Sequence, residues 1–479
     1  MKMIIGGEYR SASDQSTVNV VNPATGEVFD TVPAATYEDT QEALENARKG
    51  FLEWSQTPTH ERLSILYHFA DMLEENAEEL AQIACREGGK AITLCRSEIA
   101  AALVVFRGFF EKARSLYGET FVRDTEERVI NDFAFTVREP LGVVACVIPF
   151  NYPTELFAHK VAPALAVGNA VIIKPASDTP LANIFVTDLL IKAGVPGNAC
   201  QIITGSGAKI GKWLAESEKI NAISLTGSTE VGIETMGNCV KNLHHCFLEL
   251  GGNDPMIMLE DCDIDLAVRE AVDGRASNAG QTCCANKRFI VQNSIKEEFT
   301  QKLKAALEQV KVGDPTLDET TFGPVISERA AKDVESQIQH TIDQGAKCIL
   351  GGKRNGAFID ATLLVDVTPD MDIAGPLEVF GPVWPVIGFD TVDEAIQIAN
   401  QIPYGLQSGV MTKDMKKAFK VASAMQAGCC VINGSGNYRN ANQPFGGYKM
   451  TGLGREGIAH TLEEMTQMKT IVLKGIFSE

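Results

Sequence analysis

The stretch 143–174, VVACVIPFNYPTELFAHKVAPALAVGNAVIIK, decides the fold class of this chain. Short, continuous apolar runs stand at its two ends, and a helix-like segment, 154–168, separates them. Such runs are typical of strands buried on both faces, and strands that alternate with helices form parallel sheets. Two more apolar runs, 199–205 and 222–227, follow with helical patterns between them. The sequence therefore predicts a nucleotide-binding type of α/β sheet covered by helices.

Helical and mixed regions flank this stretch. Residues 36–117 carry apolar side chains at i, i+3, i+4 and i+7, which predicts helices. A second α/β region begins after a Gly-Gly-Asn boundary at 251–253. We expect strands there at 254–261 and 287–293, and helices at 263–280, 295–310 and 326–345. A chain of 479 residues is too long for one core, so two or three domains are expected.

Charge and cysteine content exclude several classes of protein. With 43 Lys and Arg against 62 Asp and Glu, the formal net charge is -19, which argues against nucleic acid or an anionic membrane as partner. No apolar run approaches the ~20 residues of a membrane helix, and MKMIIGGEYR lacks a signal-peptide core. We therefore expect a cytoplasmic protein. The 12 cysteines include neither a CxxC pair nor zinc-type spacing, so no metal site is expected.

Two adjacent thiols stand in the stretch 278–287, NAGQTCCANK. A disulfide between the neighbours Cys283 and Cys284 would be strained, and a metal site would need further ligands. A thiolate nucleophile is the third interpretation. A buried cysteine that acts as a small hydrophobe is the alternative for each of them.

Seven motifs lie in order along the chain, and together they resemble the aldehyde dehydrogenase superfamily. They are IPFNYP (148–153), KPASDTP (174–180), LTGSTEVG (225–232), LELGG (248–252), NAGQTC (278–283), LEVFGPV (377–383) and PFGGYKMTGLGREG (444–457). The resemblance covers nearly the whole chain. It implies a Rossmann-type cofactor domain, an α/β catalytic domain and a small β extension for oligomerisation.

The resemblance implies the domain limits and the assembly. Residues 1–120 and 141–251 would form the dinucleotide-binding domain, and 252–450 the catalytic domain. Residues 121–140 and 451–479 would bridge subunits in a homodimer or homotetramer. Both segments contain β-like stretches, for which pairing with a neighbouring subunit and an ordinary edge hairpin are equally open.

The catalytic residues follow from the same resemblance. Cys283 would attack the aldehyde to give a thiohemiacetal that can release hydride. The side-chain amide of Asn151 would donate to the oxyanion. Glu249 ends an apolar strand, so its raised pKa would suit a general base that activates the hydrolytic water. Lys160 and Glu456 would relay its proton, with a structural ion pair as the equal alternative.

The cofactor is expected to be NAD or NADP. Gly227 and Ser228 end a strand and open a helix, so backbone N–H groups would face the pyrophosphate. Lys174 would reach the adenosine ribose, Glu378 the nicotinamide ribose, and Phe380 the nicotinamide. The stretch 205–211, GSGAKIG, has GxGxxxG spacing and is discounted as the phosphate site. Further cofactor contacts are expected at Ile148, Pro149, Phe150, Ser177, Val231 and Leu250.

Two departures from the family pattern concern cofactor choice and substrate. Ser177 stands where NAD-preferring relatives often carry Glu, so NADP is permitted, while Asp178 leaves NAD open. Ser277 and His159 occupy the positions of the two arginines typical of succinate-semialdehyde dehydrogenases. Arg439 is the candidate that would replace this carboxylate clamp.

The predicted function is oxidation of an aldehyde to the acid, with a short hydroxyaldehyde or a semialdehyde as substrate. The pair His159-Lys160 is also similar to the lactaldehyde and glyceraldehyde-type branch. Two alternatives remain open: a coenzyme-A-acylating enzyme, which would usually lack Glu249, and a catalytically inert scaffold, against which the intact Cys, Asn and Glu set argues.

Overall fold

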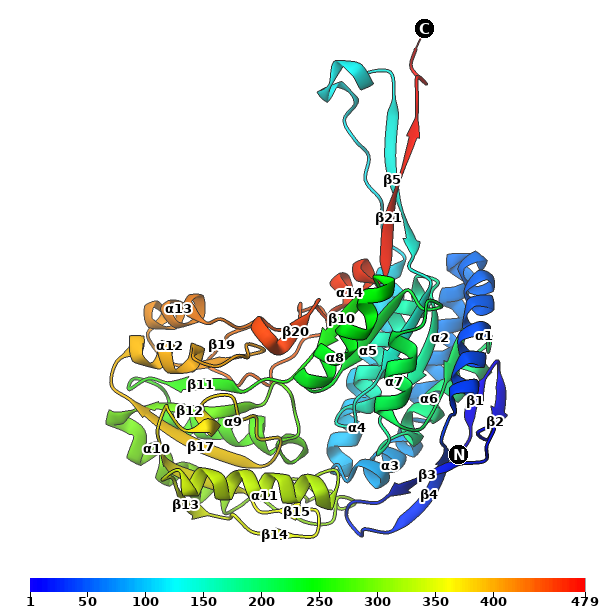
Figure 1. Cartoon of the computed structure of the whole chain (residues 1–479). Helices are drawn as coiled ribbons and strands as arrows, with labels where there is room; N and C mark the ends of the chain where they lie inside the picture. The colour runs from blue at the N-terminus through cyan, green and yellow to red at the C-terminus, as the bar shows by residue number, and fades with distance from the viewer. Residues whose placement is uncertain (479) are drawn as a thin grey trace.

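Two separate β-sheets organise the chain, whose computed structural model describes residues 1–478 (Figure 1). From β8 to β10 the strands of the first sheet are parallel, which confirms the predicted α/β class. In spatial order this sheet contains β2 (Glu8–Arg10), β1 (Met3–Ile5), β8 (Cys200–Ile202), β7 (Ala170–Lys174), β6 (Val143–Val147), β9 (Ala222–Thr226), β10 (His245–Glu249) and β20 (Gly452–Leu453).

The strand order of the first sheet reverses between β6 and β9. The chain runs outward from β6 to β8 through α5 (Pro153–Ala166) and α6 (Leu181–Ala193). It then crosses back through α7 (Gly207–Ala215) to β9, and α8 (Thr229–Cys239) leads on to β10. Ligands of open α/β sheets bind outside the carboxyl ends of the strands at such a reversal. The ends of β6 and β9 therefore mark the expected position of a dinucleotide.

The second sheet is parallel except for its edge strand β13. Its spatial order is β13 (Lys347–Leu350), β16 (Thr362–Val367), β17 (Val383–Phe389), β12 (Asn286–Gln292), β11 (Asp254–Met258), β18 (Gly409–Met411) and β19 (Val431–Ile432). The helices of this region are α9 (Ile264–Ala276), α10 (Asn293–Leu307), α11 (Glu328–Asp343), α12 (Val392–Asn400) and α13 (Met415–Ala424). Each strand and helix expected at 254–345 is present.

Four helices occupy the expected helical region, and two hairpins complete the lower part of the molecule in Figure 1. The helices are α1 (Tyr37–Gln56), α2 (Thr59–Glu75), α3 (Ala77–Gly88) and α4 (Ile92–Ala113). The hairpins pair β3 (Thr17–Val21) with β4 (Val28–Pro33) and β14 (Arg354–Asn355) with β15 (Phe358–Ile359). A capping box between Thr36 and Asp39 starts α1, and Gly89 ends α3 in the left-handed region at φ 68°.

A two-stranded arm projects from the body of the molecule (Figure 1). It pairs β5 (Phe133–Pro140) with β21 (Thr466–Leu473) in antiparallel register. Only the second half of 121–140 is a strand, because 3-10 turns occupy Arg123–Thr125 and Glu127–Val129. The two β-like segments thus pair with each other within the chain.

Two apolar cores accompany the two sheets. The first contains buried side chains from Met3 to Cys239 together with Ile458, Leu462 and Met465 near α14 (Ile458–Glu464). The second spans Met256 to Met425. No helix among residues 1–478 is long and apolar enough to cross a membrane.

Candidate active site

A cavity of about 430 Å³ opens where the two sheets approach each other. The first sheet contributes the carboxyl ends of β6, β9 and β10, as the strand reversal predicts. The segments before β12 and β17 of the second sheet close it from the other side. The cavity brings together these expected site residues: Pro149, Phe150, Asn151, Gly227, Ser228, Glu249, Leu250, Cys283, Glu378 and Phe380.

A strained loop presents Cys283. Asn278, Ala279 and Gly280 adopt left-handed φ values of 49°, 54° and 76° in succession. Two non-glycine residues rarely occupy this region side by side, so surrounding contacts must hold them there. At Gly280 a Cβ atom would lie 2.2 Å from the carbonyl oxygen of Gly381, so only glycine fits.

The buried Lys287 fixes the other end of this loop. Its Nζ donates to the carbonyl oxygens of Thr282 at 3.0 Å and Cys283 at 2.5 Å. It also lies 3.3 Å from Glu378 Oε1. Lys287 therefore ties the nucleophile loop to the loop before β17.

The surroundings of Cys283 disfavour the thiolate form of its side chain. A hydrogen bond with the Cys284 thiol and burial raise the pKa of Cys283 well above its ordinary value. The charges of Lys287 and Arg439 act in the opposite direction but do not overcome this. Attack on an aldehyde therefore requires a base to accept the thiol proton.

Asn151 is locked against the nucleophile loop. Its Nδ2 donates to the carbonyl oxygen of Gln281 at 3.0 Å, and Nδ2 of Asn278 donates to the carbonyl oxygen of Asn151 at 3.0 Å. An amide nitrogen carries two hydrogens, so one N–H of Asn151 remains for an oxyanion. This geometry fits the expected role of Asn151.

A buried ion pair between Lys90 and Glu98 supports the turn that carries Asn151. Oε1 of Glu98 accepts the backbone N–H groups of Thr154 at 2.8 Å and Glu155 at 3.2 Å, which caps α5. Nζ of Lys90 lies 4.0 Å from the ring centroid of Tyr152.

The same turn reaches the nucleophile loop through hydroxyl groups. The Tyr152 hydroxyl lies 2.9 Å from Ser277 Oγ and 3.4 Å from Thr282 Oγ1. The ion pair thus supports both sides of the thiol, through the cap of α5 and through Tyr152.

Glu249 is buried at the end of β10, and neither of its carboxylate oxygens has a hydrogen-bond partner among the described residues. Burial raises its pKa well above the ordinary value, and the charges of Cys283 and Glu456 add to the effect. Such a carboxyl group is suited to proton transfer near neutral pH.

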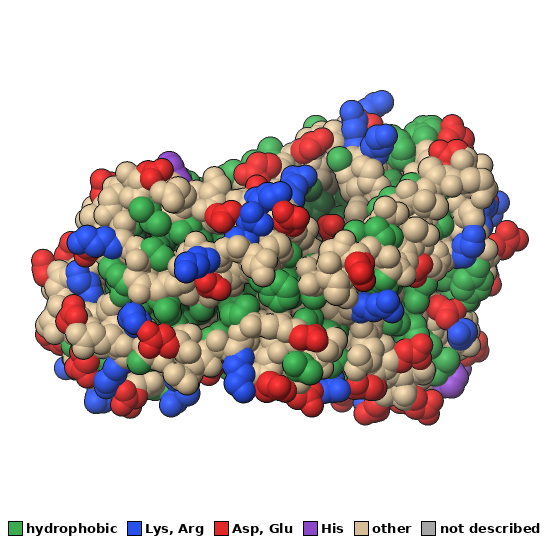
Figure 2. All heavy atoms as spheres, turned by 90° about the horizontal axis from the view of Figure 1, so that it is seen from below, with side chains coloured by type: hydrophobic (Ala, Val, Ile, Leu, Met, Phe, Trp, Pro, Cys, Tyr) green, Lys and Arg blue, Asp and Glu red, His purple; other side chains and the backbone are tan. Residues whose placement is uncertain are grey.

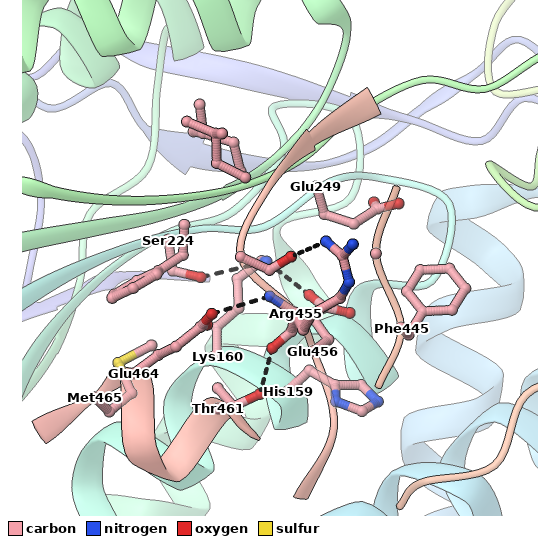
Figure 3. A pocket seen from close by; sticks show the side chains of 15 residues that line it. His159, Lys160, Ser224, Glu249, Phe445, Arg455, Glu456, Thr461, Glu464 and Met465 are labelled. Carbon is pink, nitrogen blue, oxygen red and sulfur yellow. Dashed lines mark hydrogen bonds and ion pairs between the residues drawn. The ribbon is translucent and has the colours of Figure 1, made fainter. Parts of the chain in front are cut away.

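Lys160 and Glu456 form an ion pair next to Glu249, with 3.1 Å between Nζ and Oε1 (Figure 3). Ser224 Oγ lies 3.5 Å from the same Nζ. The opposite oxygen of Glu456 accepts from Arg439 Nη2 at 2.6 Å. Burial raises the pKa of Glu456, but the charges of Lys160 and Arg439 outweigh it and lower the pKa.

His159 lies outside this ion-pair network. Both of its ring nitrogens are buried without a partner in the described part of the chain, and its ring meets that of Phe109 edge-on. Burial lowers the pKa of His159 to about 3, with the charge of Arg439 adding to the effect, so the ring is neutral. His159 therefore supplies no positive charge to a substrate.

The start of α8 has the properties of a dinucleotide site. Ser228 caps the helix by accepting the Val231 N–H at 3.4 Å, and Gly227 precedes it. Thr226 Oγ1 faces the same cavity region and is buried without a partner within residues 1–478. Its unsatisfied hydroxyl and the helix N-terminus both fit a phosphate-bearing ligand.

Glu378 and Phe380 line the opposite wall. Phe380 meets Phe150 edge-on with ring centroids 6.0 Å apart. Oε1 of Glu378 accepts the N–H of Gly252 at 3.2 Å. A Cβ atom at Gly251 would lie 2.2 Å from Oε2 of Glu378, so a glycine is required there. The carboxylate is thus preset in the cavity wall, as the role in ribose binding requires.

Four expected cofactor residues do not line the cavity itself. Lys174 is buried at the end of β7, and burial lowers its pKa to about 8 against the charge of Asp178. Ser177 Oγ donates to the carbonyl oxygen of Gly205 at 2.9 Å, and Ile148 is buried. Val231 is exposed on the first turn of α8. Their role in cofactor binding stays a prediction.

Several supporting residues were not identified from the sequence. Lys287 lies in the quoted stretch 278–287. A single Lys at the start of an apolar strand is the sequence feature that could have indicated its structural role. Lys90 and Glu98 are distant in sequence from the motifs, and no pattern pointed to them. The sequence does not indicate the pairing of Glu155 with Arg439 either. The two residues are 284 positions apart in the chain, and only the tertiary fold brings them together.

The fold and the cavity fit a dinucleotide-dependent oxidoreductase, because Cys283 and the start of α8 line one cavity. The model of the aldehyde dehydrogenase family matches residues 9–471. The chain belongs to the aldehyde dehydrogenase family, which confirms the resemblance drawn from the motifs. It is an NAD(P)-dependent oxidoreductase of that family.

The chain is similar over its full length to characterised relatives. It is 36% identical over 471 residues to a glutarate-semialdehyde dehydrogenase of Pseudomonas putida, covering 98% of this chain and 97% of that protein. It is 34% identical over 470 residues to the NADP(+) succinate-semialdehyde dehydrogenase of Escherichia coli, and the match covers 97% of this chain and 96% of that protein.

Solved structures agree with this assignment. A succinate-semialdehyde dehydrogenase from Burkholderia pseudomallei superposes with a TM-score of 0.96 at 35% identity, covering 99% of this chain and 98% of that chain. A betaine aldehyde dehydrogenase from Staphylococcus aureus in complex with NAD+ also superposes with a TM-score of 0.96 at 34% identity. The match covers 100% of this chain and 95% of that chain.

Proposed function

We propose that the chain oxidises a short aldehyde to its carboxylic acid, with Cys283 as nucleophile, Asn151 as oxyanion donor and Glu249 as base. The observation that carries the proposal is their convergence on one cavity with a helix N-terminus suited to a dinucleotide. The names of the relatives favour semialdehydes among short aldehydes. Short hydroxyaldehydes are the other candidate class.

The first step forms a bond between the Cys283 sulfur and the carbonyl carbon. The thiol proton passes to a base, and the carbonyl π electrons move to the oxygen, which the remaining N–H of Asn151 stabilises. Oxyanion donors of this kind contribute about 2.7–4 kcal/mol. A bound NAD(P) would supply the hydride acceptor, and loss of hydride from the same carbon re-forms the C=O bond and gives the Cys283 thioester.

The second step releases the acid. Glu249 takes a proton from a water molecule, the water oxygen attacks the thioester carbon, and the carbon–sulfur bond breaks to release the acid and the Cys283 thiolate. The pair of Lys160 and Glu456 lies beside Glu249 and is suited to pass its proton onward. Burial raises the pKa of Glu249, which makes its carboxylate a stronger base toward water.

The test is formation of reduced nicotinamide from an aldehyde panel with each of NAD and NADP. Wild-type protein should produce acid and reduced cofactor in equal amounts, while Cys283→Ser should lose turnover by about 10³-fold or more. Unchanged turnover in Cys283→Ser would reject the proposal. Product analysis with and without coenzyme A distinguishes hydrolysis from acyl transfer, and Glu249 favours hydrolysis.

We further propose that the chain works as a homodimer or homotetramer. We also propose that residues 1–120 and 141–251 form the cofactor-binding domain and that residues 252–450 form the catalytic domain, which contains the nucleophile. The arm supports the first proposal, since β5 and β21 leave the body and expose Met468, Val472 and Leu473. On the face in Figure 2, basic and acidic side chains are interspersed, which fits a small-molecule enzyme without a nucleic-acid partner.

A further inference from the structure

Arg439 lies close to the nucleophile, through its contact with Phe445. Its Cζ stacks 4.0 Å from the ring centroid of Phe445. Phe445 shares a small buried cluster with Cys284 and Leu406, and Cys283 packs against the same cluster. An arginine in this position is the natural partner for a substrate carboxylate, because a guanidinium binds carboxylates in a bidentate manner.

Two carboxyl groups of the protein already lie within ion-pair distance of the Arg439 guanidinium. Glu456 Oε2 accepts from Nη2 at 2.6 Å, and Glu155 Oε1 lies 3.9 Å from Nε. The second oxygen of Glu456 pairs with Lys160 at 3.1 Å. Lys160 and Arg439 therefore face two carboxyl groups: burial raises the pKa of Glu155, and the two cations lower that of Glu456.

Each member of this group is held in place. Arg439, Glu155 and Glu456 are largely buried, with side-chain exposures of 17%, 17% and 11%. Glu155 stands on the first turn of α5, where its backbone N–H donates to Glu98. Lys160 lies five residues further along the same helix and is buried. The positions of these charged side chains are thus fixed by burial and, for Glu155 and Lys160, by their places on α5.

On the basis of the function proposed above, we infer that Glu155 determines the substrate class: it occupies Arg439 and thereby selects uncharged, hydroxylated short aldehydes over aldehydes with an anionic end. A carboxylate entering this site would lose its hydration without gaining a free cation. It would also meet the charges of Glu155 and Glu456. Specificity of this kind arises from a penalty against the wrong ligand.

Uncharged hydrogen-bonding groups are available nearby. The hydroxyls of Tyr152, Ser277 and Thr282 form a cluster next to Cys283, with distances of 2.9 Å and 3.4 Å from the Tyr152 oxygen. Hydroxyls both donate and accept, so they can bind a substrate hydroxyl without an ionic partner.

The test compares two aldehydes of equal length, 4-hydroxybutanal and succinic semialdehyde, which differ only at the far end. Wild-type protein should favour the hydroxyaldehyde in kcat/KM by about tenfold or more. Glu155→Gln keeps the side-chain volume and releases Arg439, so the ratio should move toward the semialdehyde by about tenfold. Adding Arg439→Met to Glu155→Gln should remove that gain.

Glu464→Gln is the matched control. Glu464 is a partly buried carboxyl group in the neighbouring cavity with Glu456, and it accepts the backbone N–H of Arg455 at 3.0 Å (Figure 3). Its substitution should leave the substrate ratio unchanged. A wild-type preference for the semialdehyde, or equal shifts in Glu155→Gln and Glu464→Gln, would overturn the inference.

A second measurement does not depend on turnover. Glutarate is added as an anionic ligand while iodoacetamide alkylates Cys283. It should not slow alkylation of the wild-type thiol, and it should slow alkylation in Glu155→Gln. Protection of the wild-type thiol by glutarate contradicts the inference. Absence of oxidation with every aldehyde, in contrast, would reject the proposed function itself.

Discussion

At the scale of single residues, the neighbouring thiol of Cys284 raises the pKa of Cys283. Its hydrogen bond is the largest cause of the raised pKa of Cys283. Cys284→Ala should therefore lower that pKa and speed alkylation of Cys283 by iodoacetamide at neutral pH, about tenfold for each pKa unit. Cys430→Ala, in the other adjacent pair of thiols, is the control and should have no effect. An unchanged pH profile of alkylation in Cys284→Ala would show that the neighbouring thiol is irrelevant.

Glu249 provides a second prediction at this scale. Removal of the base in Glu249→Gln should leave acylation possible and slow hydrolysis by about 10²–10⁴-fold. Rapid mixing should then show a burst of about one reduced nicotinamide per active site, followed by slow turnover. Because burial raises the pKa of Glu249, wild-type hydrolysis should fall as the pH drops through that raised pKa. A variant with full steady-state rate would exclude Glu249 as the base.

At the scale of elements, the start of α5 depends on a buried ion pair between Lys90, in the loop that joins α3 to α4, and Glu98 of α4. Glu98→Gln leaves Lys90 without its charge partner and weakens the cap of α5, so the free energy of unfolding should fall by about 3–5 kcal/mol. Because the same turn holds Asn151, kcat should fall with little change in KM. Denaturant titration and steady-state kinetics measure the two effects.

Glu87→Gln is the matched control for this element. Glu87 caps α6 in the same way, accepting the N–H groups of Leu181 at 2.7 Å and Ala182 at 2.9 Å. Burial raises the pKa of Glu87 to about 8, so its carboxyl group is largely uncharged at neutral pH. Glu87→Gln should change stability without the loss of kcat. Equal losses of kcat in both variants would mean that Glu98 acts only through stability.

At the scale of the whole molecule, the projecting arm leads us to predict that it holds subunits together. A chain truncated after residue 466 lacks most of β21 and leaves β5 unpaired. Light scattering should give an oligomeric mass for the full chain and a lower mass for the truncated one. An unchanged mass would place the subunit contacts elsewhere. A monomeric full chain would reject the oligomer.

The sequence by itself determined the parallel sheets, their helices, the family and the nucleophile loop, because local apolar periodicity and short motifs encode them. Only the tertiary structure showed the direction in which the pKa of Cys283 is shifted, which depends on the Cys284 thiol and on burial. It likewise decided the pairing of Glu155 with Arg439 and the support of Asn151 by Lys90 and Glu98. Such contacts join residues far apart in the chain, and their energies depend on desolvation, which exists only after the elements have packed together.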